Sequence, residues 1–375
     1  MLSFSLDTKT VQRLWQLNEA ISEKQALITS FPKETLEAIH RYARISQIGA
    51  STRIENAVLT DAEVDWVDTI LSKDARPTAF EAHRNIIENK LSKDRERSIE
   101  EVAGCRAMLH LIYEQASELF PLTESSLCGL HSELLRFYPK AHHFLGRYKT
   151  QINKVVETNH ATGASRVVFD TAPSGTITET AMADLIVWYN QSIHTEPWTL
   201  AVASEFVFRF LAIHPFQDGN GRLGRALFLL ALLQAPGKTV SSLARYMAID
   251  RHIERHKEEY YLTLNRCSVG KFSPNPKRYE VQYFLLLMIQ IVEESLNDIE
   301  TYEKKNASIQ TLSPSALKVL DGFKDMPEIR LQTKEICKIT GLPRRTIAYV
   351  LSTLLKEKLI QRYGKGAGVR YQLIF

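Results

Sequence analysis

One stretch of the sequence, residues 213–225 (IHPFQDGNGRLGR), combines residue types that bind phosphate groups. Glycine tolerates positive φ and lets a ligand approach the backbone, so the turn at residues 219–221 can direct N–H groups inward. The apolar run that follows, residues 221–233, predicts a helix, and the free N–H groups at a helix N-terminus bind anions. Arg222 and Arg225 are three residues apart, on neighbouring positions of the first turn, where guanidinium groups can bind further phosphate oxygens.

Two more residues of this stretch have side chains suited to reactions of a polyphosphate. Asp218 can hold a Mg²⁺ ion that bridges two phosphates, and His214, four residues upstream, can accept a proton near neutral pH. Taken singly, His-Pro-Phe can be a core turn, and Gly-Asn-Gly is often only a turn. A structural loop does not need a base, an acid and two arginines at one helix start, so we interpret the stretch as a polyphosphate site with a base beside it.

The elements that must position these residues are mostly helices, and the sequence predicts a mainly α protein. Apolar residues recur at spacings of three and four in residues 102–119, 182–193 and 200–213. Residues 146–169 are the exception, because Thr, Ile and Val are frequent there and turn-forming residues separate two short runs. We interpret this segment as a β-hairpin inserted in a helical domain.

The end of the chain has its own pattern and its own charge. Residues 301–311 are polar and lack periodicity, which predicts a linker. Residues 312–375 then give helix, helix, turn, helix and two short strands, the order of a winged helix-turn-helix. This segment has 12 basic and 5 acidic residues, whereas the whole chain has a net charge of only +4. The asymmetry favours DNA as a partner, although winged helices also serve in dimerisation or protein docking.

The composition is that of an ordinary soluble globular protein. With 375 residues, 44% hydrophobic and 24% charged, the chain has material for two or three domains and is not a disulfide-stapled mini-protein. The four cysteines lie far apart without a CxxC pair, which argues against a thiolate metal site and a disulfide framework. A secretory signal and a membrane-spanning run are not recognisable, so we expect a cytoplasmic protein without a membrane partner.

The segment HPFQDGNGRLGR, from His214 to Arg225, resembles the Fic-domain signature H-x-F-x-[DE]-G-N-G-R-x-x-R at every fixed position. The resemblance extends over roughly residues 45–290 in the order of elements. It implies a Fic-type helical domain with a β-hairpin flap and a small C-terminal winged helix-turn-helix domain. The domains that we expect are an N-terminal helical region at 1–100, the Fic catalytic domain at 101–300 and the winged helix-turn-helix domain at 312–375.

The resemblance implies a protein adenylyltransferase, which transfers AMP from ATP to a Ser, Thr or Tyr hydroxyl of a target protein or of itself and releases pyrophosphate. By this analogy His214 deprotonates the hydroxyl, Asp218 binds Mg²⁺, Arg222 contacts the β-phosphate and Arg225 the γ-phosphate. The other ATP-binding residues that it implies are Gly219, Asn220 and Gly221 around the phosphates, Ile152, Asn153, Lys154 and Val155 in the flap, and Tyr260 and Tyr261 beside the adenine. The edge of the flap would also register the target chain by main-chain pairing.

A second match, Ser51-Thr52-Arg53-Ile54-Glu55-Asn56, fits the family's inhibitory pattern [ST]-x-x-x-E-[GN]. Ser51 and Glu55 are four residues apart, so a hydroxyl and a carboxylate can meet on one helical face. In the family the glutamate pairs with the second arginine of the signature, here Arg225, and blocks the γ-phosphate. The resemblance therefore implies autoinhibition by a segment that contains Ser51, Glu55 and Asn56.

Two other functions remain open at this point. One is a Fic enzyme that transfers a different nucleotide moiety, and the other is an ATP-sensing transcriptional regulator that binds DNA through its winged helix. The resemblance also implies a homodimer, whose pairing could control the inhibitory helix. It leaves open the removal of AMP from a modified target.

Overall fold

The computed structural model describes residues 1–72, 79–91, 96–158, 165–237 and 239–374. The first helices are α1 (Thr8–Thr29), α2 (Lys33–Ile54), α3 (Asp61–Ser72), α4 (Ala79–Leu91), α5 (Glu96–Gln115) and α6 (Glu124–Leu135). They are followed by the strands β1 (Lys154–Thr158) and β2 (Ser165–Asp170). The next helices are α7 (Thr176–Thr195), α8 (Thr199–Ile213), α9 (Asn220–Leu233), α10 (Thr239–Ala244), α11 (Ile249–Arg255), α12 (Lys257–Ser268), α13 (Gln282–Leu296) and α14 (Asp298–Gln310). The C-terminal elements are α15 (Pro314–Lys324), α16 (Thr333–Thr340), α17 (Arg344–Lys356), β3 (Ile360–Tyr363) and β4 (Arg370–Leu373).

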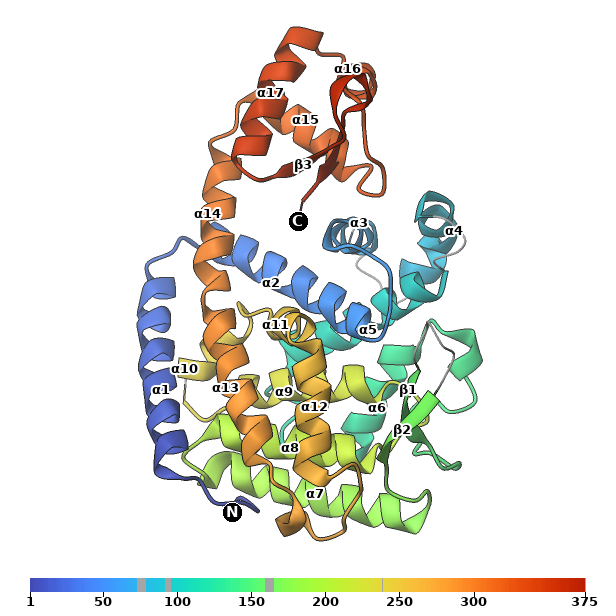
Figure 1. Cartoon of the computed structure of the whole chain (residues 1–375), viewed down its shortest axis with the longest axis vertical. Helices are drawn as coiled ribbons and strands as arrows, with labels where there is room; N and C mark the ends of the chain where they lie inside the picture. The colour runs from blue at the N-terminus through green and yellow to red at the C-terminus, as the bar shows by residue number, and fades with distance from the viewer. Residues whose placement is uncertain (73–78, 92–95, 159–164, 238, 375) are drawn as a thin grey trace.

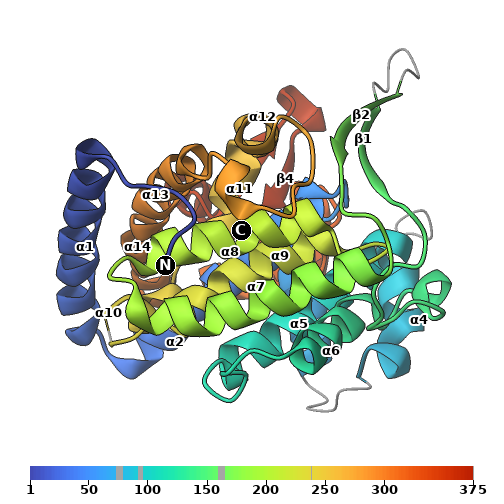
Figure 2. The same cartoon turned by 90° about the horizontal axis from the view of Figure 1, so that it is seen from below.

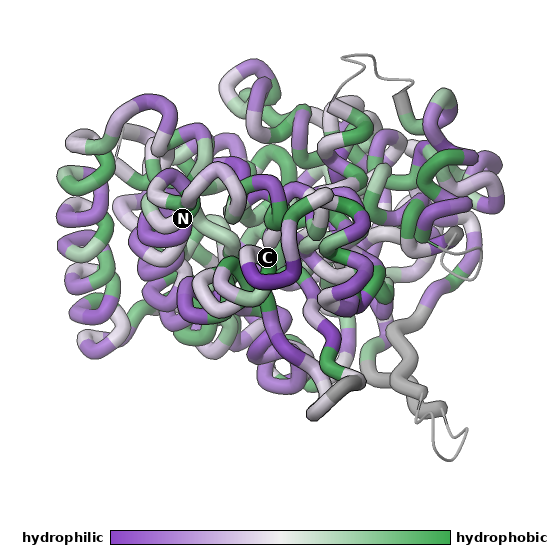
Figure 3. The backbone as a smooth tube through the Cα atoms, turned by 90° about the horizontal axis from the view of Figure 1, so that it is seen from above, coloured by the Kyte–Doolittle hydropathy of each residue, from purple (hydrophilic) through white to green (hydrophobic). Residues whose placement is uncertain are grey.

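The helices α8 and α9 form the centre of the molecule. Nearly all their residues are buried, as expected of helices that are apolar on every side. Figure 2 shows α7, α8 and α9 lying side by side. At the periphery the pattern differs, and Figure 3 shows hydrophilic and hydrophobic segments alternating along α1. The connection between α8 and α9, residues 214–219, is therefore held at both ends by the most buried helices of the fold.

Helix α2 crosses the molecule and is part of the same core (Figure 1). Every residue from 45 to 54 except Arg53 is buried. One hydrophobic core includes residues from Leu14 to Ile299, and α5 runs across residue 100, where the N-terminal region was expected to end. The segment that contains the inhibitory pattern is therefore packed into the same body as the phosphate-binding stretch.

The prediction of a linker at residues 301–311 is wrong, because most of this segment belongs to α14. Tyr302 is buried against Ile39 and Ala43 of α2, and its hydroxyl accepts from Arg251 of α11. The other faces of α14 are polar, so its sequence shows no apolar periodicity. Figure 1 shows α14 continuing from α13 towards the C-terminal elements.

The C-terminal elements α15, α16, α17, β3 and β4 occur in the predicted order and have a small core of their own, which includes Val319, Ile336 and Leu354. The strands β3 and β4 form an antiparallel pair. Among the described residues, no helix combines the length and the apolar character that crossing a bilayer requires.

Candidate active site

His214 ends helix α8 and faces a pocket at the start of α9. Its backbone has the left-handed conformation (φ 52°), and its N–H still donates to the Phe210 carbonyl at 2.9 Å. The ring Nδ1 lies 3.2 Å from the Leu211 carbonyl oxygen. Because a carbonyl only accepts hydrogen bonds, Nδ1 carries the ring hydrogen and Nε2 keeps its lone pair. The geometry thus prepares Nε2 as a proton acceptor.

The surroundings of His214 keep its ring neutral. The pKa of the ring is lowered from 6.5 to about 4, mainly by burial; the hydrogen bond to the Leu211 carbonyl opposes this shift and the nearby Lys149 ammonium adds to it. The ring nevertheless lines the pocket. A neutral imidazole can therefore accept a proton there over the whole physiological pH range.

The loop between His214 and α9 is closed by the side chain of Asn220. Its Oδ1 accepts from the Phe216 N–H at 2.9 Å, and its Nδ2 donates to the Phe216 carbonyl at 2.7 Å. Both polar groups of the Asn220 amide are therefore used within the loop, and the predicted contact of residues 219–221 with phosphates would be made by backbone N–H groups. What remains for a phosphate is the backbone N–H of Asn220 in the first turn of α9.

His131 of α6 packs against the same loop, a role that the sequence does not predict. Its ring stacks on Phe216 with the centroids 3.9 Å apart. Its Nδ1 accepts from the Gly146 N–H at 3.0 Å, which places the hydrogen on Nε2, 3.0 Å from the Asp218 carbonyl oxygen. Burial lowers the pKa of His131 to about 4, so the ring keeps this neutral form.

The hairpin predicted at residues 146–169 is an antiparallel pair of β1 and β2, and the segment before it is tied to the His214 loop. Asn153 donates to the Phe216 carbonyl at 2.7 Å and accepts from Lys149 Nζ at 2.9 Å. Lys149 is buried, also donates to the Ile213 carbonyl at 3.0 Å, and has its pKa lowered to about 8 by burial. Asn153 lines the pocket, but its amide serves mainly to hold the loop.

The other flap residues named from the sequence lie differently. Ile152 is 70% exposed and makes no part of the pocket wall. Lys154 and Val155 are in β1, paired with Asp170 and Phe169, and their side chains lie outside what the structure describes. Their predicted contact with a nucleotide stays a prediction.

Arg222 is a buried cation with spare hydrogen-bonding capacity. Its Nη2 lies 3.4 Å from Asp218 Oδ1 and its Nη1 lies 3.7 Å from Glu101 Oε1. Within the described part of the chain, Nε and Nη1 have no hydrogen-bond partner. Because unpaired polar atoms are costly inside a protein, this guanidinium is prepared for a polar ligand.

Arg225 is buried as well, but carboxylates surround it. Glu55 Oε1 lies 3.0 Å from its Nη1, and Asp250 Oδ2 lies 3.4 Å from its Nε. The Ser51 carbonyl accepts from Nη2 at 2.8 Å. The pairing of Glu55 with Arg225 that the resemblance implies is thus present in the structure.

Ser51 and Glu55 do not meet, in contrast to the expected contact between a hydroxyl and a carboxylate. Helix α2 ends at Ile54, so Glu55 is its C-cap, and its carboxylate bonds to Arg225. Ser51 is buried and acts through its backbone carbonyl on Arg225. Asn56 follows with φ 72°, the left-handed conformation in which Asn and Gly are favoured, and this explains the choice of residues at the end of the pattern.

Glu55 reaches Arg225 across Gly221, the second residue of α9. A Cβ at position 221 would collide with Glu55 Oε1 and would lie 3.3 Å from Arg225 Nη1. Glycine is therefore required for this close approach. The carboxylate lies directly on the backbone where the N-terminus of α9 attracts negative charge.

The pocket at the start of α9 has a volume of about 230 Å³, below the usual range of ligand sites. Glu55, Gly221 and Arg225 lie along its wall, so the Glu55 side chain takes up part of the space. The predicted pair Tyr260 and Tyr261 lines the pocket too. The apolar part of the wall consists of Phe169, Phe208, Leu211, Ala212 and Leu264.

The residues of the pocket can hold a magnesium ion only if phosphate groups supply further ligands. Asp218 is half-buried, lines the pocket and accepts from the Gly219 N–H at 2.6 Å. The described residues contain no group of three or more His, Cys, Asp or Glu side chains placed to hold a metal. A single carboxylate is the donor set with which proteins bind Mg²⁺ when phosphates supply other ligands. Asp218 would therefore hold the ion.

Two acidic residues of the site were missed in the sequence, Glu101 beside Arg222 and Asp250 beside Arg225. Each is a single carboxylate on a helix far from residues 213–225 in the sequence, with no pattern around it. They could have been inferred from one requirement: a buried arginine, such as Arg222 or Arg225, needs a carboxylate nearby to balance its charge. Burial raises the pKa of Asp250, and Arg225 opposes this.

Comparison with known proteins agrees with this geometry. Residues 121–232 match the model of the Fic/DOC family. A Fic family protein from Desulfovibrio desulfuricans G20 has a similar structure, with a TM-score of 0.56 and 21% identity, over 100% of this chain and 98% of that chain. A Fic domain-containing signaling protein from Bacteroides thetaiotaomicron VPI-5482 has a TM-score of 0.55 and 21% identity, over 78% of this chain and 96% of that chain.

Residues 134–508 of Fic-1 from C. elegans are similar at a TM-score of 0.52 and 17% identity, over 77% of this chain and 72% of that chain. At these identities the three structures share the fold. The match of the family model covers α6 to α9, the elements that position the pocket. Residues 121–232 therefore form a Fic/DOC family domain, and Fic domains in general transfer nucleotide-like groups.

Proposed function

We propose that this protein is a protein adenylyltransferase that transfers AMP from ATP to a Ser, Thr or Tyr hydroxyl of a target protein or of itself, and that Glu55 inhibits it. The observation that carries the proposal is one pocket with a neutral His214 ring and the buried guanidinium of Arg222, whose Nε and Nη1 lack hydrogen-bond partners among the described residues. The helix start between them adds N–H groups for phosphate oxygens.

Each residue then has a definite task. The hydroxyl oxygen bonds to the α-phosphorus, the bond from that phosphorus to the bridging oxygen breaks, and pyrophosphate leaves. His214 Nε2 takes the hydroxyl proton, while Arg222 and the first turn of α9 stabilise the charge on the phosphates. Asp218 would hold Mg²⁺, which neutralises phosphate charge when bound.

Inhibition follows from competition for Arg225. In the present geometry Glu55 occupies the guanidinium edge nearest to Gly221, and a γ-phosphate would need the same place. Displacing Glu55 breaks a charge-assisted hydrogen bond of 3.0 Å, while Asp250 remains beside Nε to balance the arginine. ATP can therefore be bound in the productive orientation only after the Glu55 carboxylate has moved.

Mass spectrometry after incubation with ATP and Mg²⁺ tests the proposed reaction. We expect a Ser, Thr or Tyr residue, on the protein itself or on a protein in added lysate, to gain one adenylyl group. GTP, CTP and UTP in parallel samples distinguish transfer of another nucleotide. Nucleotide binding without any covalent product would instead select the ATP-sensing regulator.

The dependence of the rate on pH is a separate prediction. A base whose pKa lies near 4 is already unprotonated well below neutral pH, so the transfer rate should not fall between pH 8 and pH 6 through protonation of His214. The loss should begin only as the pH falls towards that lowered value. Initial rates at ATP concentrations well below KM, which report groups of the free protein, measure this, with circular dichroism as a check on folding. A one-proton loss of rate centred near pH 6.5 would show that the surroundings do not lower the pKa of the His214 ring.

The C-terminal unit favours DNA as a second partner. Arg344, Arg345 and Tyr349 are exposed on α17, and Tyr349 is 75% exposed. Lys365 and Arg370 of the wing are exposed as well. Basic residues with an aromatic side chain on one open helix suit phosphate contacts and base edges in a groove.

A salt titration of a labelled duplex checks the DNA proposal. The whole protein should shift the duplex at low salt, and the shift should weaken steeply on going from about 50 to 200 mM salt. The variant Arg344→Ala with Arg345→Ala should bind several-fold more weakly. The control, Lys318→Ala with Lys324→Ala on α15, removes the same charge from another helix. An equal loss of DNA affinity in both variants, or no shift of the duplex at low salt, would exclude α17 as the DNA-recognition helix.

A further inference from the structure

Arg53 lies two residues before Glu55, in the last turn of α2, and is used fully by its neighbours. Its Nε and Nη2 donate to the two carboxylate oxygens of Glu254, at 2.7 and 2.9 Å. Its Nη1 donates to Asp61 Oδ1 at 2.7 Å and to the Leu59 carbonyl at 3.0 Å. All three guanidinium nitrogens therefore bind defined acceptors, and the pair with Glu254 has the two-bond geometry specific to arginine.

These partners belong to the two helices that border the inhibitory contact. Glu254 lies on α11, one turn after Asp250, which contacts Arg225. The Asp250 N–H also donates to Gln47 Oε1 of α2 at 2.9 Å. Asp61 is the first residue of α3, so Arg53 joins the end of α2 to both α3 and α11.

The space for this arrangement is provided by Gly49, one turn before Arg53 on α2. A Cβ at position 49 would collide with Asp61 Oδ1 and would lie 2.7 Å from Arg53 Nη1. Glycine is a poor residue for a helix interior, so its presence in a buried turn of α2 indicates that something else needs the room. Here the room is taken by the ion pair of Arg53 with Asp61.

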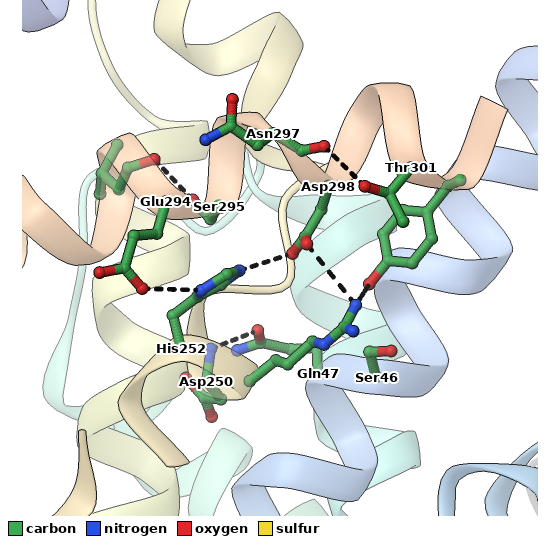
Figure 4. A network of polar contacts seen from close by, with 12 residues as sticks. Ser46, Gln47, Asp250, His252, Glu294, Ser295, Asn297, Asp298 and Thr301 are labelled. Carbon is green, nitrogen blue, oxygen red and sulfur yellow. Dashed lines mark hydrogen bonds and ion pairs between the residues drawn. The ribbon is translucent and has the colours of Figure 1, made fainter. Parts of the chain in front are cut away.

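Helix α11 is itself held firmly, so Glu254 is a fixed partner. Figure 4 shows His252 of α11 between two carboxylates, with Nε2 2.8 Å from Asp298 and Nδ1 3.2 Å from Glu294. Arg251 is 3.5 Å from Asp298 and donates to the Tyr302 hydroxyl at 3.0 Å. These contacts join α11 to α13 and α14 and leave little freedom for the short helix.

We propose that Arg53 is a positioning residue for inhibition, whose bonds to Glu254 and Asp61 fix the last turn of α2 so that Glu55 reaches Arg225 across Gly221. The proposal rests on the proposed function, because it needs Glu55 to be the inhibitor. Glu55 lies beyond the helix, as the C-cap, and its place depends on where the last turn ends. Backbone hydrogen bonds from Glu55 and Asn56 to the last turn of α2 hold the segment locally, and the Arg53 side chain ties that turn to α3 and α11.

The rate of AMP transfer in a set of variants tests this inference. Arg53→Met removes the donors but keeps an aliphatic stem, and Glu254→Gln removes one partner charge and leaves Arg53 in place. We expect the initial rate of labelled AMP incorporation to rise at least fivefold in each. Arg53→Lys should give an intermediate rate, because an ammonium cannot form the two parallel bonds to Glu254.

The matched control lies on the same helix. Arg41 of α2 donates through Nε and Nη2 to Asp65 of α3, at 3.0 and 2.7 Å, far from the pocket. Arg41→Met therefore also removes an arginine–aspartate pair between α2 and α3. It should leave the rate of transfer unchanged, so a rise in this control as large as in Arg53→Met would overturn the inference.

A double variant distinguishes positioning from a general loosening of the fold. If Arg53 acts only through Glu55, Arg53→Met combined with Glu55→Gly should be no faster than Glu55→Gly alone. A further rise in the double variant contradicts this role, as does an unchanged rate in both Arg53→Met and Glu254→Gln when Glu55→Gly is activated. If Arg53→Met does not fold, Glu254→Gln alone decides between these outcomes. An inactive Glu55→Gly variant would instead contradict the proposed function.

Discussion

Replacement of Glu55 by glycine should raise the rate of AMP transfer roughly ten- to a hundredfold, the factor that corresponds to losing one charged hydrogen bond. In the wild-type chain the Glu55 carboxylate lies 3.0 Å from Arg225 Nη1 and fills the space above Gly221. Glycine would open that space to a γ-phosphate, and Arg225 would keep Asp250 and the Ser51 carbonyl as partners. Incorporation of labelled AMP into the protein and into lysate proteins measures the change.

A glutamate near the start of α2 provides the control for this experiment. Glu37 is exposed, and among the described residues its ion pair is with Lys33 one turn earlier, at 3.6 Å. Glu37→Gly makes the same exchange of residues far from the pocket and should leave the rate as it is. Glu55→Gln should give an intermediate rate, because it keeps the shape and loses the charge. Equal rates for Glu55→Gly and the wild type would mean that this carboxylate does not inhibit.

Replacement of His214 by alanine should abolish transfer, with a loss of about 10²–10⁴-fold that reflects removal of a general base. We expect the affinity for ATP to stay within a few-fold, because Arg222, Arg225 and the start of α9 bind the phosphates. The experiment belongs in the Glu55→Gly background, where the rate is high enough to measure a large loss. Calorimetric titration with ATP and Mg²⁺ reports the binding.

Another histidine shows whether the loss is specific. His143 is exposed and not part of the pocket wall, and its replacement by alanine should leave both the rate and the binding of ATP unchanged. Substantial activity in His214→Ala would exclude the imidazole as the base. A loss of ATP binding in the same variant would assign His214 to substrate binding instead.

The sequence predicts the parts of the fold in which local pattern and packing agree. Residues 200–213 and 221–233 are strongly apolar, and they form the buried helices α8 and α9. The hairpin follows from its composition, and the elements from α15 to β4 follow from their turn signals. Helix α14 was missed because only a narrow face of it is buried, so the packing against α2 that fixes it leaves little trace in the sequence.

For the site, residue types indicate the chemistry but not the direction of each side chain. The sequence predicts that Asn220 lies in the loop and Ser51 on a helix. It does not predict that the Asn220 amide binds the loop backbone or that Ser51 contributes its carbonyl oxygen. Asp250 and Glu101 could not be inferred, because they come near the arginines only through tertiary packing. Long-range pairs of this kind have no spacing rule in the chain.

If Glu55 inhibits transfer as proposed, the depth at which α2 is buried limits how that inhibition can be relieved. Nine of the ten residues from 45 to 54 are buried in the common core, so ejecting this helix would expose much of that core to water. Under the proposed inhibition, we therefore expect activation to rearrange the end of α2, where Glu55 lies, without ejecting the helix.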